Sequence, residues 1–232
     1  MTPYYERDGI TGAGSAVAAR ATDQSLGGGV IPTSALQPKQ LLVEAIPRHI
    51  AKGIIVENHY LHRMGIATYA FGVFGPQREL VGAITFGPLA SREAAHSLGE
   101  DKPTLELTRL WLSDRCAHNS ESRVIRISIR LLCQLCPGLE RIVTYADPSV
   151  GHDGTIYRAS GFRYVGLGPQ RYDFVPASVA ERQFPRTRAA GTHLKTRRGL
   201  ENLGLEYTRL ARVRKHRYVL AVKRLAQEVL AL

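Results

Sequence analysis

Residues 119–148 read NSESRVIRISIRLLCQLCPGLERIVTYADP, and this stretch decides the fold class. Asn119 to Ser122 are helix-starting residues, and apolar side chains then recur at helical spacing from Val124 to Cys136, where Pro137-Gly138 ends the pattern. Residues 141–146 form a short, largely apolar run that stops at Asp147-Pro148 and is typical of a buried strand. The stretch therefore predicts a helix followed by a strand, which is a unit of α/β sheets.

The same patterns extend outward in both directions. Before this unit, the sequence predicts strand 42–46, helix 47–58, a hairpin of strands 67–74 and 79–86 about Gly75-Pro76-Gln77-Arg78, and strand 105–112. After it come a short helix at 154–160 and strands at 162–165 and 218–222. We expect a mixed α/β sheet, with residues 39–232 as the folded domain and the Gly-rich residues 1–38 as a flexible arm.

The composition indicates a chain that neither spans a membrane nor is secreted. No apolar run approaches the roughly 20 residues that cross a bilayer, and the first residues lack the pattern of a secretory signal. Three cysteines argue against a disulfide scaffold, and we expect Cys133 and Cys136 to pack within their helix. These features predict a cytoplasmic protein with no membrane partner.

Positive charge is concentrated near the end of the chain. The net charge is +11, and residues 181–232 carry thirteen Lys or Arg against four acids. Such a field attracts phosphate backbones, although a solvated tail is the alternative. We expect a basic insertion at about 178–213, before the last strand, to bind nucleic acid; its candidate contacts, with two flanking residues, are Arg186, Arg188, Lys195, Arg197, Arg198, Arg212, Arg214 and Lys215.

Four polar clusters could carry chemistry: residues 57–60, 106–109, 119–123, and 145–148 with 151–157. The predicted helix start at Asn119, Ser120, Ser122 and Arg123 would present backbone N–H groups to a phosphate or carbonyl oxygen, although Asn119 or Ser120 could also simply cap the helix. Asp147 follows a strand, at the edge where α/β sheets bind ligands. With His59 and Tyr157 it could form an acid/base group or a metal set, and such ligands suit iron better than structural zinc. Each residue taken alone is more often a buried, satisfied polar group.

Taken together, several short motifs in fixed order resemble the bacteriophage Mom family of DNA adenine modification proteins, which are similar to the GNAT N-acetyltransferase superfamily. The motifs are His59-Tyr60, residues 106–110, residues 119–123, residues 145–148, Gly151-His152, residues 154–157 and residues 215–218, and the resemblance covers roughly residues 41–222. It implies a GNAT-like, mostly antiparallel sheet flanked by helices. The residues that match functional positions of the family are His59, Tyr60, Arg109, Ser122, Asp147 and Tyr157, with His59, Asp147 and Tyr157 as its iron set.

The resemblance implies a transferase that converts adenine in double-stranded DNA to N6-carbamoylmethyladenine and so protects phage DNA from restriction in the host cytoplasm. The added group has the atoms of glycine amide, so we expect glycyl transfer from an ester such as a glycyl-tRNA, followed by rearrangement. Ser122 would stabilise the oxyanion, and Asp147 or His59 would act as base or bind iron(II). Acetyl-CoA with iron-dependent chemistry is the rival donor scheme. The superfamily's Gly-rich pyrophosphate loop is replaced here by residues 119–123, which argues against ordinary coenzyme A binding.

Two other functions stay open from the sequence. The chain could be an acetyltransferase acting on an amine of a small molecule, a protein or a modified DNA base, or a GNAT-like module that only binds DNA. The sequence also leaves open whether the chain binds tRNA and whether it forms a homodimer.

Overall fold

A computed structural model describes residues 35–89, 96–98, 102–177 and 197–222. Its centre is a seven-stranded sheet in the order β1-β2-β3-β4-β5-β9-β6. The strands are β1 (Leu42–Ala45), β2 (Tyr69–Phe74), β3 (Leu80–Gly87), β4 (Thr104–Leu112), β5 (Arg141–Ala146), β6 (Arg163–Leu167) and β9 (His216–Ala221). Every neighbouring pair is antiparallel except β4 and β5, which confirms the mixed, mostly antiparallel sheet.

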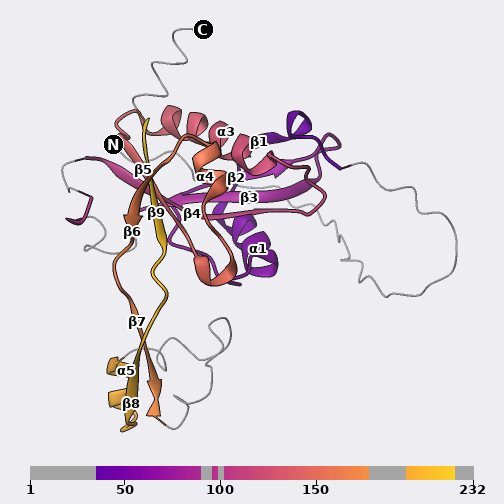
Figure 1. The fold of residues 1–232 in the computed structure, drawn as a ribbon. Helices are drawn as coiled ribbons and strands as arrows, with labels where there is room; N and C mark the ends of the chain where they lie inside the picture. Colours follow the sequence, from indigo (N-terminus) through magenta and orange to yellow (C-terminus); the bar gives the residue numbers. More distant parts are fainter. Residues whose placement is uncertain (1–34, 90–95, 99–101, 178–196, 223–232) are drawn as a thin grey trace, which may run out of the picture. The chain divides into compact units, whose positions relative to one another are not determined.

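Helices cover both faces of this sheet (Figure 1). Helix α1 (Arg48–Asn58) packs on one face, where Ala51 and Ile55 meet the small side chains Ala70 and Ala83. Helix α3 (Ser120–Leu135) covers the other face with its apolar stripe and encloses the main core, whose members include Ile125. The short helix α4 (Thr155–Ala159) contacts α3 and β6. Alternation of side chains along β2 and β3 supplies both faces, because successive residues of a strand point to opposite sides.

The parallel pair β4–β5 comes apart partway along its length. Its register joins only Thr104–Glu106 to Arg141–Val143, although both strands continue past this point. Beyond it, the Thr144 hydroxyl donates to the Leu107 carbonyl at 3.3 Å, a side-chain link where backbone pairing has ended. The separation leaves backbone groups of β4 without a strand partner on that side and makes room for a cavity.

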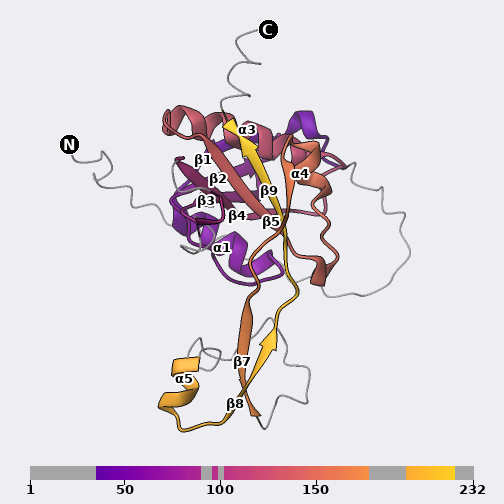
Figure 2. The same cartoon turned by 60° about the vertical axis from the view of Figure 1, so that its left-hand side comes forward.

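A second, two-stranded sheet is inserted between β6 and β9. It consists of β7 (Tyr172–Pro176) and β8 (Tyr207–Ala211), with helix α5 (Arg197–Asn202) packed against β7 (Figure 2). The two chain segments that lead into it form a neck, residues 168–171 and 212–215. Gly168 N–H donates to the Lys215 carbonyl at 2.8 Å, and Arg212 N–H donates to the Arg171 carbonyl at 2.9 Å. The neck therefore prolongs the pairing of β6 with β9.

The structure confirms all the predicted helices and strands, with ends shifted by a few residues. β7, α5 and β8 were not predicted, and they occupy part of the segment expected as a basic insertion. Residues 1–34 of the predicted arm lie outside the described residues, whereas Leu36 is buried and pairs with Cys116. Within the described part of the chain, no helix is both long and apolar enough to cross a membrane.

Capping of α3 was predicted wrongly. Asn119 occupies the N-cap position in a left-handed conformation (φ 69°), and its side chain makes no cap hydrogen bond. The serine hydroxyls point to carbonyls instead: Ser120 Oγ donates to Ala117 O at 2.6 Å, and Ser122 Oγ donates to Asn119 O at 3.0 Å. No side-chain oxygen of these residues accepts from the free N–H groups of the first turn.

Candidate active site

A cavity of about 690 Å³ opens where β4 and β5 separate. Its walls come from distant parts of the chain: the segment after α1 (58–63), β4 (106–112), the end of β5 with the loop into α4 (145–146 and 151–157), the neck, and Glu121 of α3. Segments from both faces of the sheet thus line a single space. Four predicted site residues, His59, Tyr60, Arg109 and Tyr157, line it together.

His59 ends α1 and is buried in the cavity wall. Its Nδ1 accepts the N–H of Leu61 at 3.1 Å. Burial, reinforced by the Arg109 guanidinium, lowers the pKa of His59 to about 4. The ring is therefore neutral near pH 7, and because Nδ1 is an acceptor, the ring proton is on Nε2. His59 thus offers the cavity an N–H donor rather than a free base.

Tyr60 stacks on His59, with ring centroids 4.4 Å apart, and meets the His152 ring edge-on at 5.3 Å. Burial and the nearby Asp147 charge raise the pKa of Tyr60 to about 12, so its phenol keeps its proton. Burial also raises the pKa of Tyr157, whose ring packs against Phe162 and Tyr218. The cavity wall is therefore aromatic, with protonated phenols.

Arg109 brings a positive charge into this wall from β4. Its Nε donates to the Arg63 carbonyl at 3.1 Å, and burial lowers its pKa from the usual arginine value. An arginine stays charged despite such a shift. The guanidinium and the His59 N–H together give the cavity two fixed donors, a combination suited to an oxygen that gains negative charge.

Asp147 lies beside the cavity rather than in its lining. Its Oδ1 accepts from the N–H and hydroxyl of Ser149, at 3.0 and 2.5 Å, and its Oδ2 lies 3.3 Å from the Lys215 ammonium. Burial alone would raise the pKa of Asp147, but the Ser149 bonds and the Lys215 charge outweigh it and hold the pKa below its usual value. Asp147 is therefore an ionised residue that ties the end of β5 to the neck.

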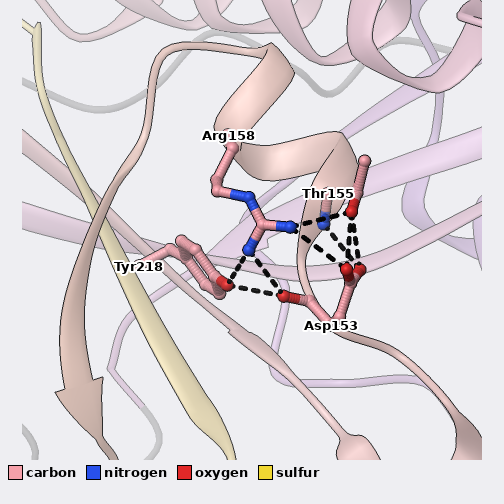
Figure 3. A network of polar contacts seen from close by, with 4 residues as sticks. All are labelled: Asp153, Thr155, Arg158 and Tyr218. Atoms are coloured by element: carbon pink, nitrogen blue, oxygen red, sulfur yellow. Dashed lines mark hydrogen bonds and ion pairs between the residues drawn. The ribbon is translucent and has the colours of Figure 1, made fainter.

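The loop between Asp147 and α4 is fixed by a polar network (Figure 3). The Tyr218 hydroxyl donates to the Asp153 carbonyl at 2.6 Å, and the Arg158 guanidinium reaches that carbonyl, the Tyr218 hydroxyl and the Asp153 carboxylate. Bonds from the Thr155 hydroxyl and N–H lower the pKa of Asp153 to about 2. Gly154 sits against the Tyr218 ring at φ 79°, where a Cβ would lie 2.3 Å from it. The network positions His152 and Tyr157 in the cavity wall.

The predicted iron set does not fit a metal ion. Both carboxylate oxygens of Asp147 are already engaged, one of them by an ammonium group that would repel a cation. His59 uses Nδ1 as an acceptor, and the Tyr157 phenol is protonated and packed between rings. Throughout the residues that the structure describes, no three His, Cys, Asp or Glu side chains group as metal ligands. The arrangement favours hydrogen-bond and electrostatic chemistry at these residues.

The start of α3 lies apart from the cavity lining. Asn119, Ser120, Ser122 and Arg123 do not line it, whereas Glu121 does. Ser120 is fully buried, and the Ser122 carbonyl accepts from Ser160 Oγ of the α4 end at 3.4 Å. The helix start is therefore held against α4 at the margin of the cavity.

The predicted nucleic-acid contacts are only partly described. Arg186, Arg188 and Lys195 lie outside the described residues. Arg197 and Arg198 are on α5, where Arg197 pairs with Glu201 at 2.7 Å. Arg212, Arg214 and Lys215 form one side of the neck: Arg212 pairs with Asp173, Arg214 Nε donates to the Gly168 carbonyl at 2.8 Å, and Lys215 pairs with Asp147. The basic neck therefore borders the cavity.

Several residues that line the cavity were assigned no role from the sequence. Glu106 and Tyr145 both line the cavity, and burial, reinforced by the Glu106 charge, raises the pKa of Tyr145. The available signal for Glu106 was a charged residue within a strand, three positions before Arg109. Arg63, His152 and Arg171 also line the space. Their positions depend on loop and neck geometry, which periodicity does not report.

A model of the Mom protein family matches residues 40–232. The methylcarbamoylase Mom of Escherichia phage Mu is 35% identical over 133 residues, which are 55% of this chain and 54% of that protein. The chain thus matches about half the length of this curated relative.

Among solved structures, a chimeric spermidine N-acetyltransferase of Vibrio cholerae shares 12% identity over 81% of this chain and 99% of that chain, with a TM-score of 0.48. A GNAT family N-acetyltransferase of Escherichia coli in complex with CoA shares 15% identity over 53% of this chain and 69% of that chain, with a TM-score of 0.38.

Proposed function

Since the chain belongs to the Mom protein family, we propose that it is a transferase that modifies adenine in DNA. The product is N6-carbamoylmethyladenine, as the family resemblance implies. The observation that carries the proposal is the cavity at the β4–β5 separation, where His59, Tyr60, Arg109 and Tyr157 converge next to a basic neck. The target adenine leaves the duplex stack to enter it, because base edits at N6 need access that stacking denies.

The proposed donor is a glycyl ester carried by an RNA. Adenine N6 attacks the ester carbonyl, a new C–N bond forms, and the RNA leaves as its free hydroxyl after a proton passes from N6 to the leaving oxygen. The free glycyl amine then attacks adenine C6 through a five-membered ring. The bond between C6 and the original nitrogen breaks, and that nitrogen becomes the terminal amide. The second step is an isomerisation, so it needs no oxidant and no further nitrogen.

The cavity residues suit the charges that this route develops. The neutral His59 Nε2–H and the Arg109 guanidinium donate to the carbonyl oxygen as it becomes an oxyanion. Tyr60 and His152 offer aromatic surface for a base that has left the stack. The Glu106 carboxylate, also in the lining, accepts a proton from the attacking amine.

Access from two sides supports a reaction between two large substrates. Residues 58–63 line the cavity from the α1 face, and Glu121 with residues 155–157 lines it from the α3 face. The neck lines the cavity with Arg171 and Arg212 and leads into the inserted sheet, and we assign DNA to that side. The donor then enters from the α3 side.

The test is nucleoside analysis of plasmid DNA from cells that express the chain, grown with labelled glycine and with ¹⁵N at adenine N6. The proposal requires deoxyadenosine that has gained one glycyl residue, with the ¹⁵N in the terminal amide. If the ¹⁵N stays on C6, the rearrangement is wrong. An acetyl gain instead would make the chain an acetyltransferase, and unmodified DNA with retained DNA binding would make it a binding module.

Asp147→Ala provides the matched variant for this experiment. Loss of the carboxylate releases Lys215 and Ser149, so modification should fall at least a hundredfold while DNA binding is retained or strengthened, because the Lys215 charge of the neck is no longer neutralised. Arg209→Ala, which removes a guanidinium stacked 3.4 Å over the Tyr172 ring, should weaken DNA binding and spare the cavity.

A further inference from the structure

Helix α3 carries a row of arginines on its solvent face. Arg123, Arg126 and Arg130 are all exposed, and their spacing of three and four residues places them on one face of the helix. The opposite face, with Val124, Ile125 and the other apolar residues, is buried in the core. We call these three residues the α3 arginine row.

The α3 arginine row makes no ion pair with the described residues. Several other arginines do, as in Arg78 with Glu44 and Arg158 with Asp153, and others, such as Arg109 and Arg214, donate to backbone carbonyls. Helix α3 contains one acid, Glu121, on the side away from the row. In the described part of the chain, no ion pair or side-chain hydrogen bond joins the row to a carboxylate. A helix face that serves only solubility usually mixes both signs of charge.

The dimensions of the row match a nucleic-acid strand. Seven residues of α-helix span roughly 10 Å, and a strand in a duplex presents one phosphate per ~3.4 Å of axis, so three arginines oppose about three phosphates. Guanidinium groups also bind phosphate oxygens in a bidentate manner that lysine cannot reproduce.

The position of the row connects it to the cavity. Glu121, two residues before Arg123, lines the cavity, and the adjoining turn is held to α4 through Ser160 and the Ser122 carbonyl. A polyanion bound along α3 would therefore run toward the cavity from the α3 face. The basic neck lies on another part of the rim, formed by residues 168–171 and 212–215.

We infer that the α3 arginine row binds the phosphate backbone of the donor RNA and guides its aminoacylated end into the cavity. This inference rests on the proposed function, which requires two polyanions to reach one cavity. DNA is assigned to the neck and inserted sheet, so the donor RNA is the partner that needs a separate basic surface. A second stretch of the DNA is the competing occupant.

The test compares full-length wild type with a variant carrying Arg123→Gln, Arg126→Gln and Arg130→Gln. The probes are a 3′-glycylated RNA hairpin and a DNA duplex, each titrated over a range of salt. We expect the variant to bind the RNA at least tenfold more weakly, with a slope of log affinity against log salt reduced by about two, and to bind the DNA within twofold of wild type. Changing the same residues to Lys keeps the charge but not the bidentate contacts, so it should restore the salt slope and only part of the RNA affinity, which separates loss of charge from misfolding.

Equal weakening toward both probes would assign the row to the DNA path and overturn the inference, as would unchanged binding to both. The proposed function is measured separately, by product formation in the wild type. If the RNA binds through the row but no carbamoylmethyladenine forms, only the proposed function fails. If adenine is modified while RNA affinity ignores the row, only this inference fails.

Discussion

His59 is the residue whose chemistry the structure defines most sharply. Its Nδ1 is taken by the Leu61 N–H, and burial leaves the ring neutral down to a pKa of about 4. A neutral imidazole that donates from Nε2 polarises a carbonyl without carrying a charge of its own. Since an unperturbed histidine titrates near pH 6.5, the sequence alone suggested a base or a metal ligand at this position.

Protonation of His59 should make stability fall in mild acid. The folded pKa lies below the unfolded value of 6.5, so the unfolded chain binds more protons between about pH 4 and pH 6.5. The stabilisation is complete above pH 6.5 and is lost as the pH drops toward 4. We expect the free energy of unfolding, measured in urea, to fall between pH 7.5 and pH 5. The fall should be larger in wild type than in His59→Gln by on the order of 1 kcal/mol, a figure that allows for solvent screening through the cavity. Equal losses in the two proteins would contradict the assignment.

Gly154 is required by both its backbone and its neighbour. At φ 79°, a Cβ would lie 2.3 Å from the Tyr218 ring, so Gly154→Ala should destabilise the fold by roughly 2 kcal/mol or more and displace His152 from the cavity. Gly151→Ala is the matched control, because Gly151 has φ 78° and nothing within 4 Å of the added Cβ. In thermal unfolding, the free energy of unfolding of Gly154→Ala should be lower than that of Gly151→Ala by at least about 1 kcal/mol. Similar losses would mean that the contact with Tyr218 does not matter.

At the scale of elements, the sequence predicted the helices and strands that bury an apolar face, and it did not predict those with few buried side chains. Helix α3 and strands β2 to β5 bury continuous apolar faces, which impose periodicity on the sequence. In β7, α5 and β8, Val175 and Leu200 are the buried side chains among the described residues, so these elements leave little hydrophobic signal. Pro176 and Gly199 further weaken the propensities of β7 and α5.

The residues of the candidate site also divide into those that the sequence predicts and those whose position depends on the tertiary structure. The sequence brought His59, Tyr60, Arg109 and Tyr157 to one place, because strand ends and family motifs mark them, and the structure puts all four in the cavity lining. It did not indicate that Lys215 binds Asp147, since that ion pair depends on how the neck returns to β9. It also misjudged Asn119, whose left-handed conformation removes its side chain from the capping position.

The inserted sheet should be removable as an element. Gly168 and Lys215 are hydrogen-bonded neighbours, so replacing residues 169–214 by Asn-Gly would join β6 to β9 as a tight hairpin. We expect the seven-stranded sheet to fold with a melting temperature within about 5 °C of wild type, because the main core lies elsewhere. DNA affinity should fall at least tenfold with the loss of the arginines of the insertion. Retained DNA affinity would place the DNA surface on the seven-stranded sheet or its helices.

At the scale of the whole molecule, the two surfaces proposed to bind the substrates differ in where their positive charge lies along the chain. Nine of the eleven net positive charges lie in residues 181–232, yet some of these residues are held in ion pairs: Arg197 on α5, and Arg212 and Lys215 in the neck. The unpaired α3 arginine row lies earlier in the chain, where the sequence looked nearly neutral overall. The net charge of a long segment therefore did not reveal the α3 arginine row, which becomes a charged surface only when the helix forms.

The cavity, which is lined by segments from both faces of the sheet, also constrains the kinetics. Its described lining residues include no cysteine or serine, and its two threonine hydroxyls are engaged, Thr108 with the Thr85 carbonyl and Thr155 with the Asp153 carboxylate. Under the proposed function, we therefore expect donor and acceptor to be bound at the same moment, each reaching the cavity from its own face of the sheet. Initial rates should then follow a sequential rate law with a ternary complex, in which neither substrate has to depart before the other arrives.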